Sequence, residues 1–372
     1  MVGVYGYDGG IMSRPQSKQV EILAELRRRM VAGPYAPGAQ LPTRSELERS
    51  FQASRMTVQR VLDQLTADGF VYARGRLGTF VSKHPPHLSR YGLVFPFRNN
   101  QDANWSRFWE VLQQVAKQAD AAGPQRVPFY YGAEFKDHES YFRLVEDVES
   151  SRLAGLIFAT GPIYLTPDSI LMTAPVPRVA VMDRPMPGIA ALALDHDSYI
   201  RRALDHFQAC GRSRIGFVLG THSEAFRQKL YAAVAARGMQ TQRHWTQLVS
   251  PRFGIGARNA AHLLLHPDQH LRPDGLLIAD DHLNEHALAG LADAGAVIGQ
   301  DLDVVLHGNF PSATPLAVPA KRLGYDLHAV LEEGRALIDA LRAGRAAADS
   351  TVRIPAVFEE ETTRPAWSAQ VA

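Results

Sequence analysis

The sequence has 372 residues, of which 46% are hydrophobic, and its formal net charge at pH 7 is +2. This length and apolar content predict two or three folded domains and exclude a wholly disordered chain. The single cysteine, Cys210, excludes an intrachain disulfide, and the lack of an apolar run of about 18 residues predicts no membrane span and no membrane partner.

The N-terminal part of the chain is its basic part. Residues 1–90 hold 13 Lys and Arg against 7 Asp and Glu, whereas residues 91–372 hold 27 against 31. This asymmetry favours a phosphate-bearing partner for the first part and not for the second. Residues 1–13 are rich in glycine and predict a flexible tail. They lack the basic start and apolar core of a signal peptide, so we expect a cytoplasmic protein.

Residues 14–81 predict three helices followed by a β-hairpin. A helix over 19–30 carries its apolar residues on one face, and Thr43 with Glu46 has the capping-box spacing that begins a second helix. Ser54 can cap a third helix, which Gly69 ends. The third helix has one apolar stripe, made of Val58, Val61, Leu62 and Leu65.

The opposite face of the third helix is rich in hydrogen-bond donors. It carries Arg55, Thr57, Gln59 and Arg60, and a basic turn with Arg74 and Arg76 separates the strands expected at 70–72 and 79–81. A donor-rich helix followed by a basic hairpin predicts a winged helix-turn-helix. The helix would enter a major groove of DNA, and the wing would lie along the backbone.

The stretches PGAQLPTRSELE, SRMTVQRVLDQLTADGFV and GTFV, in this order, resemble the DNA-binding domain of the GntR family of bacterial transcription regulators. Two positions depart from the family pattern: Ser45 stands where an Arg is frequent, and Arg76 where a Gly is usual. A winged helix used only for protein contacts is the alternative. The face and the resemblance together predict these DNA contacts: Arg44, Ser45, Ser54, Arg55, Met56, Thr57, Gln59 and Arg76.

Residues 82–90 predict a linker. The stretch SKHPPHLSR has no apolar periodicity and contains two adjacent prolines. Such a composition predicts a semi-rigid, extended connection between two domains.

From residue 91 onward, short apolar runs alternate with amphipathic segments. This alternation predicts parallel sheets covered by helices on both faces, and its length over 91–362 predicts two α/β lobes with a ligand site at the carboxyl ends of the strands. Strands are expected at 92–95, 127–131, 154–159, 178–182, 191–194, 215–219, 275–279 and 304–307, and helices at 106–122, 138–150, 198–210, 224–237, 257–266, 283–294 and 321–343. Residues 363–372 are expected to form a tail.

The ordered stretches RVAVMD, ALALDHDSYIRRALDHFQACGRSRIGFVLG and DGLLIADDHLNEHALAGLADAGAVIGQDLDVVLHGNF resemble the effector domain of LacI/GalR-type regulators, which is similar to periplasmic sugar-binding proteins. The two resemblances together are typical of arabinose-repressor-like regulators. The second one implies a small effector between the lobes, held by Phe108, Asp183, Arg227, Asp280, Asn309 and Phe310.

The resemblance also implies a ligand class. A sugar or sugar derivative is expected, although the family's Gly-Tyr-Asp reads Gly308, Asn309, Phe310 in this sequence. A non-sugar acid or a nucleobase-like ligand is the alternative.

One short pattern suggests a different class of protein. His282, Glu285 and His286 match the H-x-x-E-H spacing of an inverted zinc-hydrolase motif. A metal-dependent hydrolase fused to a DNA-binding head is therefore an alternative. A catalytic zinc needs a third protein ligand and an open position, so we expect no enzyme, no metal and no cofactor.

The hypothesis from the sequence is a bacterial transcription regulator, a repressor, that responds to a small metabolite. We expect a homodimer that forms through residues 91–360 and binds a palindromic double-stranded operator, since two-fold protein symmetry imposes two-fold symmetry on the site. Such a protein would be cytoplasmic, and associated with the nucleoid when bound to DNA.

Overall fold

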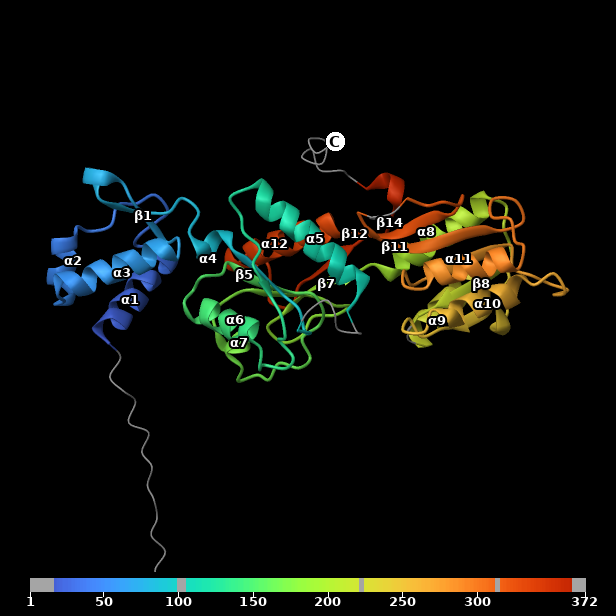
Figure 1. The fold of residues 1–372 in the computed structure, drawn as a ribbon, viewed down its shortest axis with the longest axis horizontal. Coiled ribbons are helices and arrows are strands. Elements are labelled where there is room, and N and C mark those ends of the chain that lie inside the picture. The colour runs from blue at the N-terminus through green and yellow to red at the C-terminus, as the bar shows by residue number, and fades with distance from the viewer. Residues whose placement is uncertain (1–16, 99–104, 221–223, 312–314, 363–372) are drawn as a thin grey trace, which may run out of the picture. The chain divides into compact units, whose positions relative to one another are not determined.

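The computed structural model describes residues 17–98, 105–220, 224–311 and 315–362 (Figure 1). The two predicted tails, 1–13 and 363–372, lie outside these residues. The chain forms two compact units, one of residues 1–89 with 147–153 and the other of the remaining residues. Each unit is described by itself.

The first unit contains the three predicted helices, α1 (Lys18–Ala32), α2 (Arg44–Phe51) and α3 (Arg55–Ala67). The capping box predicted for the second helix is confirmed, because Thr43 N donates to Glu46 Oε2 at 2.7 Å and Glu46 N donates to Thr43 Oγ1 at 3.4 Å. Ser54 caps α3 as predicted. The helix boundaries therefore follow local hydrogen bonds that the sequence encodes.

The core of the first unit is made by the predicted apolar stripe. Val58, Val61 and Leu65 of α3 are at most 1% exposed, as are Ile22, Leu26 and Leu47 of the other helices. Each such side chain contributes about 1.5–3 kcal/mol when fully buried. Burial of one face of α3 leaves its opposite face to solvent.

The predicted hairpin is present, and it begins one residue later than expected. Strand β1 (Val71–Ala73) pairs antiparallel with β2 (Thr79–Val81), and the turn between them is the 3-10 helix η1 (Gly75–Leu77). Gly75 and Gly78 have φ values of +54° and +105°, which glycine adopts without strain. Gln40 Nε2 donates to Leu77 O at 2.7 Å and so holds the turn.

The extended linker predicted over 82–90 is wrong in its conformation. Residues Pro86–Ser89 form a short helix, α4, and Pro85, Pro86, His87 and Ser89 are buried. Ser89 Oγ donates to Pro85 O at 3.0 Å, and the rings of His87 and Phe70 stack with centroids 5.8 Å apart. A proline is favourable in the first turn of a helix. The tertiary contacts of this segment therefore stabilise a helix where the two prolines predicted an extended conformation.

The first lobe of the second unit is built on a six-stranded parallel sheet. Its strand order is β13-β7-β6-β5-β3-β4. The helix α12 (Leu327–Arg342) contacts α5 (Arg107–Ala122) and four strands of this sheet. The other bounds are β3 (Tyr91–Val94), β4 (Phe129–Tyr130), α6 (Glu139–Glu149), β5 (Gly155–Phe158), α7 (Ile170–Thr173), β6 (Arg178–Val181), β7 (Ala190–Leu194) and β13 (Thr351–Ile354).

The second lobe has a six-stranded sheet in the order β14-β12-β11-β10-β8-β9, in which only the edge strand β14 is antiparallel. Helices α10 and α11 contact each other closely beside this sheet (Figure 1). The bounds are α8 (His196–Ala209), β8 (Ile215–Leu219), α9 (Glu224–Ala236), η2 (Arg243–Trp245), β9 (Thr246–Leu248), α10 (Ile255–Leu265), β10 (Gly275–Ile278), α11 (Asn284–Asp293), β11 (Asp303–Phe310), β12 (Lys321–Asp326), β14 (Val357–Phe358) and η3 (Glu359–Glu361).

One predicted helix is partly wrong. The segment 321–343 was expected to be helical throughout, but its first six residues form β12, which pairs with β11. Gly324 lies opposite Gly308, and a Cβ atom at position 324 would lie 1.6 Å from Gly308 O. Two glycines therefore allow these strands to approach, a tertiary effect that periodicity does not reveal.

The strands of both sheets are deeply buried. Every residue of β3, β5, β8 and β10 is buried, as expected for parallel strands covered on both faces. Among the residues that the structure describes, no helix has both the length and the apolar character needed to cross a bilayer.

Candidate nucleic-acid interface and ligand cavity

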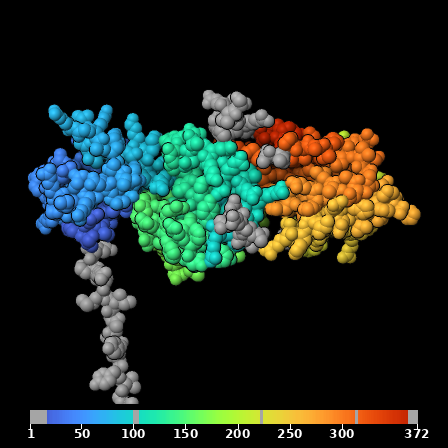
Figure 2. Space-filling view, in the orientation of Figure 1, coloured from blue at the N-terminus to red at the C-terminus, as the bar shows by residue number. Residues whose placement is uncertain are grey.

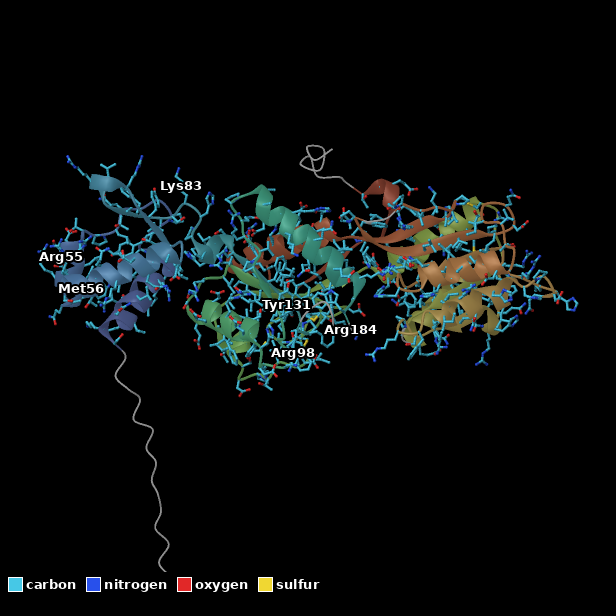
Figure 3. The ribbon with its side chains drawn as sticks, viewed as in Figure 1. Arg55, Met56, Lys83, Arg98, Tyr131 and Arg184 are labelled. Atoms are coloured by element: carbon cyan, nitrogen blue, oxygen red, sulfur yellow. The ribbon has the colours of Figure 1, made fainter. Side chains whose placement is uncertain are left out.

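The first turn of α3 presents polar side chains at the surface of the first unit. Ser54 Oγ accepts a hydrogen bond of 3.2 Å from Thr57 N and lies 2.9 Å from Thr57 Oγ1. Arg55 and Met56 project from the ribbon into solvent (Figure 3), and Met56 is 65% exposed. The cap thus fixes the backbone from which Arg55 extends.

The arginines of this unit fall into two groups. On α1, Arg28 and Arg29 both bind Glu25, and hydrogen bonds from Arg28 and then Arg29 lower the pKa of Glu25 to about 2. A second set of arginines is exposed, and their guanidinium groups have no hydrogen bond or ion pair among the residues described. It consists of Arg44 on α2, Arg55 and Arg60 on α3, and Arg74 and Arg76 in the wing.

The wing carries its basic residues away from the core. Residues 72–77 are all exposed, and Leu77 is 60% exposed. Figure 2 shows side chains of this segment standing out from the surface of the first unit. Free, exposed guanidinium groups are suited to phosphate oxygens and base edges.

The eight predicted DNA contacts lie on three segments of the first unit. Arg44 and Ser45 begin α2, and Arg76 lies in η1 of the wing. The residues from 54 to 59 lie at the beginning of α3, where Thr57 and Gln59 are half-buried. Gln59 Nε2 donates to Asp63 Oδ1 at 2.6 Å, so it is engaged within the helix.

The second unit contains a cavity of about 650 Å³ between its two lobes. The first lobe contributes Trp105, Ser106, Phe108 and Leu194. The second lobe contributes the beginning of α8, the segments after β9 and β10, and residues of β11 and β12. The segments that follow the parallel strands place the cavity at their carboxyl ends, where open α/β sheets bind ligands.

A group of acidic and amide side chains lies on one wall of the cavity. His282 Nδ1 is 3.2 Å from Oδ1 of both Asp280 and Asp281, and Asn309 Nδ2 donates to Asp281 Oδ2 at 2.8 Å. Hydrogen bonds to Asp280 and Asp281 raise the pKa of His282 to about 9. Burial alone would raise the pKa of Asp281, but the hydrogen bond from His282 and the nearby charges outweigh it, so this pKa is lowered.

Aromatic rings form a second wall. Tyr199 lies with its ring centroid 5.5 Å from that of His307 and 6.3 Å from that of Tyr325, and His196 lies 5.6 Å from Phe226. Burial lowers the pKa of His307 and raises that of Tyr199, so both are neutral near pH 7. Such a wall offers apolar ring faces beside a few polar atoms, a combination typical of small-molecule sites.

Three buried polar atoms of lining residues have no hydrogen-bond partner among the residues that the structure describes: Trp105 Nε1, Tyr199 Oη and Asn309 Oδ1. The three residues are 7%, 3% and 7% exposed. An unsatisfied buried polar group costs about 1–3 kcal/mol, so these atoms are candidates for a hydrogen bond to a bound ligand or to water.

The structure places the six predicted effector residues differently. Phe108, Asp280 and Asn309 line the cavity. Asp183 lies 3.6 Å from His196 and lines a neighbouring hollow of about 280 Å³. Arg227 pairs with Glu224 on α9 and is not among the residues that line this cavity, and Phe310 is fully buried.

Several lining residues were missed by the sequence reasoning. Tyr325 was assigned to a helix, and His307 ended an expected strand without being given a role. The sequence predicted a role for His282 only in the H-x-x-E-H pattern and none for Asp281. The signal that could have identified these two residues is their position directly after the parallel strand predicted at 275–279.

The H-x-x-E-H reading of residues 282–286 is wrong in its geometry. His282 faces Asp280 and Asp281, whereas Glu285 is an exposed side chain 3.9 Å from Arg107. His286 instead lies against Gly254, where a Cβ would be 2.0 Å from its ring. The ligand set that the hydrolase alternative requires is therefore not assembled.

Two descriptions of known protein families match separate parts of the chain. Residues 18–81 match the family described as "Bacterial regulatory proteins, gntR family", and residues 204–363 match "Periplasmic binding protein-like domain". The arabinose metabolism transcriptional repressor of Geobacillus stearothermophilus is 33% identical over 69 residues, 18% of this chain and 19% of that protein. The repressor NagR of Bacillus subtilis is 34% identical over 74 residues, 20% of this chain and 30% of that protein.

Solved structures resemble the second unit. A LacI-family regulator from an Arthrobacter species, in complex with lactose, aligns with a TM-score of 0.55 and 15% identity over 72% of this chain and 97% of that one. A LacI-family regulator from Lactobacillus casei with bound glucose aligns with a TM-score of 0.51 and 18% identity over 73% of this chain and 97% of that one.

The two kinds of likeness carry different information. At these identities the solved structures establish the fold alone. The curated relatives match over less than a third of their own length. Residues 18–81 are therefore similar to the gntR-family regulatory region, residues 204–363 are similar to the periplasmic binding protein-like domain, and the second unit has the fold seen in LacI-family regulators.

Proposed function

We propose that the protein is a transcription regulator, a repressor, whose affinity for operator DNA is controlled by a small polar metabolite bound between the lobes of the second unit. The observation that carries this proposal is the combination, in one chain, of two features: exposed arginines on a helix-turn-helix that have no partner among the described residues, and a cavity whose lining residues hold polar, acidic and aromatic side chains. The first feature suits DNA, and the second suits a ligand.

DNA binding is supported by the chemistry of the first unit. Arg55 extends from the capped first turn of α3, where recognition helices contact base edges, and Arg76 extends from the wing. Arg44 at the beginning of α2 adds a third free guanidinium group. We propose the eight residues predicted from the sequence as the DNA contacts, with Arg55 reading bases and Arg44 and Arg76 binding phosphates.

A sugar or sugar derivative is the ligand class that we propose. The carboxylates of Asp280 and Asp281 and the amide oxygen of Asn309 accept hydrogen bonds from hydroxyl groups, and the rings of Phe108 and Tyr325 offer flat apolar faces. The name of one relative, an arabinose metabolism transcriptional repressor, and the glucose and lactose bound to similar structures support the same class. Asp280 and Asp281 would repel an acidic metabolite, whereas Arg252 and the protonated His282 would attract one, so the screen includes acids as the alternative class.

We also propose that the protein is a homodimer and that its operator is palindromic. Leu248, Phe253 and Ile255 are 53%, 69% and 56% exposed and lie within eight positions of one another, so this apolar segment is the contact that we propose between the two copies. Static light scattering on the full chain should give the mass of a dimer. The charged substitution Phe253→Asp should give a monomer, whereas a dimeric F253D variant would place the contact elsewhere.

The ligand can be found by a thermal-shift screen of the full chain with neutral mono- and disaccharides, sugar derivatives, small carboxylic acids and nucleosides. A ligand that binds only the native state raises the melting temperature by mass action. At least one neutral carbohydrate should raise it. A response only to acids or nucleosides would overturn the sugar assignment, and selection of no specific DNA sequence from a random pool would overturn the proposal as a whole.

A further inference from the structure

We propose that Asp280, Asp281, His282 and Asn309 form a binding site for one divalent cation of the Mn²⁺ type on the wall of the cavity. The H-x-x-E-H pattern in the sequence assigns His282 two other partners, Glu285 and His286. Among the residues described, Asp280, Asp281 and His282 are the group whose donor atoms all lie within 4.8 Å of one another. The inference does not depend on the proposed function.

The spacing of the donor atoms matches a coordination polyhedron. His282 Nδ1 is 3.2 Å from Oδ1 of Asp280 and from Oδ1 of Asp281. Bonds of roughly 2.1 Å from a metal give edges of about 3.0 Å in an octahedron and about 3.4 Å in a tetrahedron. The observed separations lie between these values, so a small shift of the side chains is enough to bind an ion.

Asn309 provides an independent observation. This residue is 7% exposed, its Nδ2 donates to Asp281 Oδ2 at 2.8 Å, and its Oδ1 has no partner among the residues that the structure describes. A buried amide oxygen of this kind can be satisfied by a hydrogen-bond donor or by a cation. An oxygen-rich set with one imidazole suits Mn²⁺, and the cavity leaves the remaining positions of the ion open to a ligand or to water.

The charge of the cluster and the room around it also support a cation site. The cluster contains two carboxylates, of which Asp280 is 19% and Asp281 15% exposed, and a divalent ion that displaces the proton of His282 Nδ1 would compensate both charges. Gly220 leaves room for the carboxylate of Asp280, because a Cβ at position 220 would lie 2.2 Å from Asp280 Oδ2. Because residue 220 has no side chain, the carboxylate of Asp280 can lie close to its backbone and within the cluster.

The test is calorimetric titration of the full chain with MnCl₂ after treatment with EDTA and dialysis. Mn²⁺ is the probe because His206 with Cys210, and His262 with His266, are pairs that would attract a softer ion such as Zn²⁺. We expect one Mn²⁺ per chain, confirmed by the electron paramagnetic resonance spectrum of the bound ion. Asp281→Asn and His282→Gln should each weaken binding by about tenfold or more.

Two further variants separate coordination from a structural role. Asp268→Asn is the matched control, because Asp268 lies two positions after His266 with their charged atoms 3.7 Å apart, outside the cavity. It should leave Mn²⁺ affinity unchanged. Asn309→Asp adds a carboxylate ligand and should tighten Mn²⁺ binding while lowering the stability of the metal-free protein. Failure of the wild type to bind Mn²⁺ at millimolar concentration, or unchanged binding in D281N and H282Q, would overturn the proposal.

Discussion

Ser54 and Thr57 lock the first turn of α3 through two contacts, a hydrogen bond of 3.2 Å from Thr57 N to Ser54 Oγ and a separation of 2.9 Å between their hydroxyl oxygens. Each of the two hydroxyl groups thus has a partner within the helix. Arg55, which lies between them, has no such partner among the described residues and is free to extend outward. The cap therefore orients the one arginine of this turn.

Arg55→Ala should lower operator affinity without unfolding the protein, because its side chain is exposed and unpaired. A bidentate contact between arginine and guanine contributes about 1–3 kcal/mol of discrimination, so we expect a loss of about tenfold or more. Fluorescence anisotropy with labelled operator at one fixed salt concentration measures it. The control is Arg28→Ala, an arginine of the same unit that is bound to Glu25. Equal losses in both variants would contradict the role of Arg55.

Arg76→Ala should weaken binding to all DNA sequences to a similar extent, because a wing residue contacts phosphates rather than bases. The slope of log K against log salt concentration should become less steep by about one unit, which corresponds to one phosphate contact. Titrations at four or more salt concentrations, with operator and with unrelated DNA, provide this slope. An unchanged slope, or a loss confined to the operator, would show that Arg76 does not act on the backbone.

Tyr199→Phe separates ligand binding from stability. The Tyr199 hydroxyl is buried without a partner, so its removal should leave the free energy of unfolding unchanged or slightly higher. Affinity for the ligand found in the screen should fall about tenfold, because a hydrogen bond in the cavity is lost. Tyr164→Phe is the control: its hydroxyl is also buried without a partner, but Tyr164 does not line the cavity. Equal ligand affinity in Y199F and Y164F would remove Tyr199 from the site.

Tyr91→Phe should lower the stability of the second unit by about 1 kcal/mol in a pH-dependent way. The Tyr91 hydroxyl donates to Asp339 Oδ1 at 2.9 Å, and burial followed by this bond raises the pKa of Tyr91 to about 12. A raised pKa means that the contribution is complete below the unfolded value of about 10 and is lost as pH rises through 12. Denaturant unfolding of both proteins at pH 8, 10, 11 and 12 is the measurement. A difference that grows with pH would contradict this assignment.

The first unit could be predicted almost completely because its determinants are local. The cap residues Thr43 and Ser54 and the stripe of Val58, Val61 and Leu65 encode helix bounds and buried faces within a few positions. The conformation of Pro86–Ser89 could not be predicted, since the contact between His87 and Phe70 that buries it joins positions 17 residues apart.

The position of the cavity could be predicted from the sequence, but only some of its lining residues could. Asp280 and Asn309 follow or belong to strands that the sequence reveals, so their position at the carboxyl ends of the strands was predictable. Tyr325 could not be found, because β12 depends on the close approach of Gly308 and Gly324. Tyr199 lies on a helix whose pattern shows only that it is buried, and the lack of a partner for its hydroxyl is visible only in three dimensions.

The central claim is that a ligand between the lobes changes the affinity of the first unit for DNA. A ligand can shift such an equilibrium only by binding the DNA-competent and DNA-incompetent states with different affinity. The most direct measurement is operator affinity of the full chain, by anisotropy, with and without saturating amounts of the carbohydrate found in the screen. We predict that the ligand lowers this affinity by about fivefold or more, in line with typical coupling energies, and that Y199F needs more ligand for the same effect. Identical operator affinities with and without saturating ligand would contradict the account.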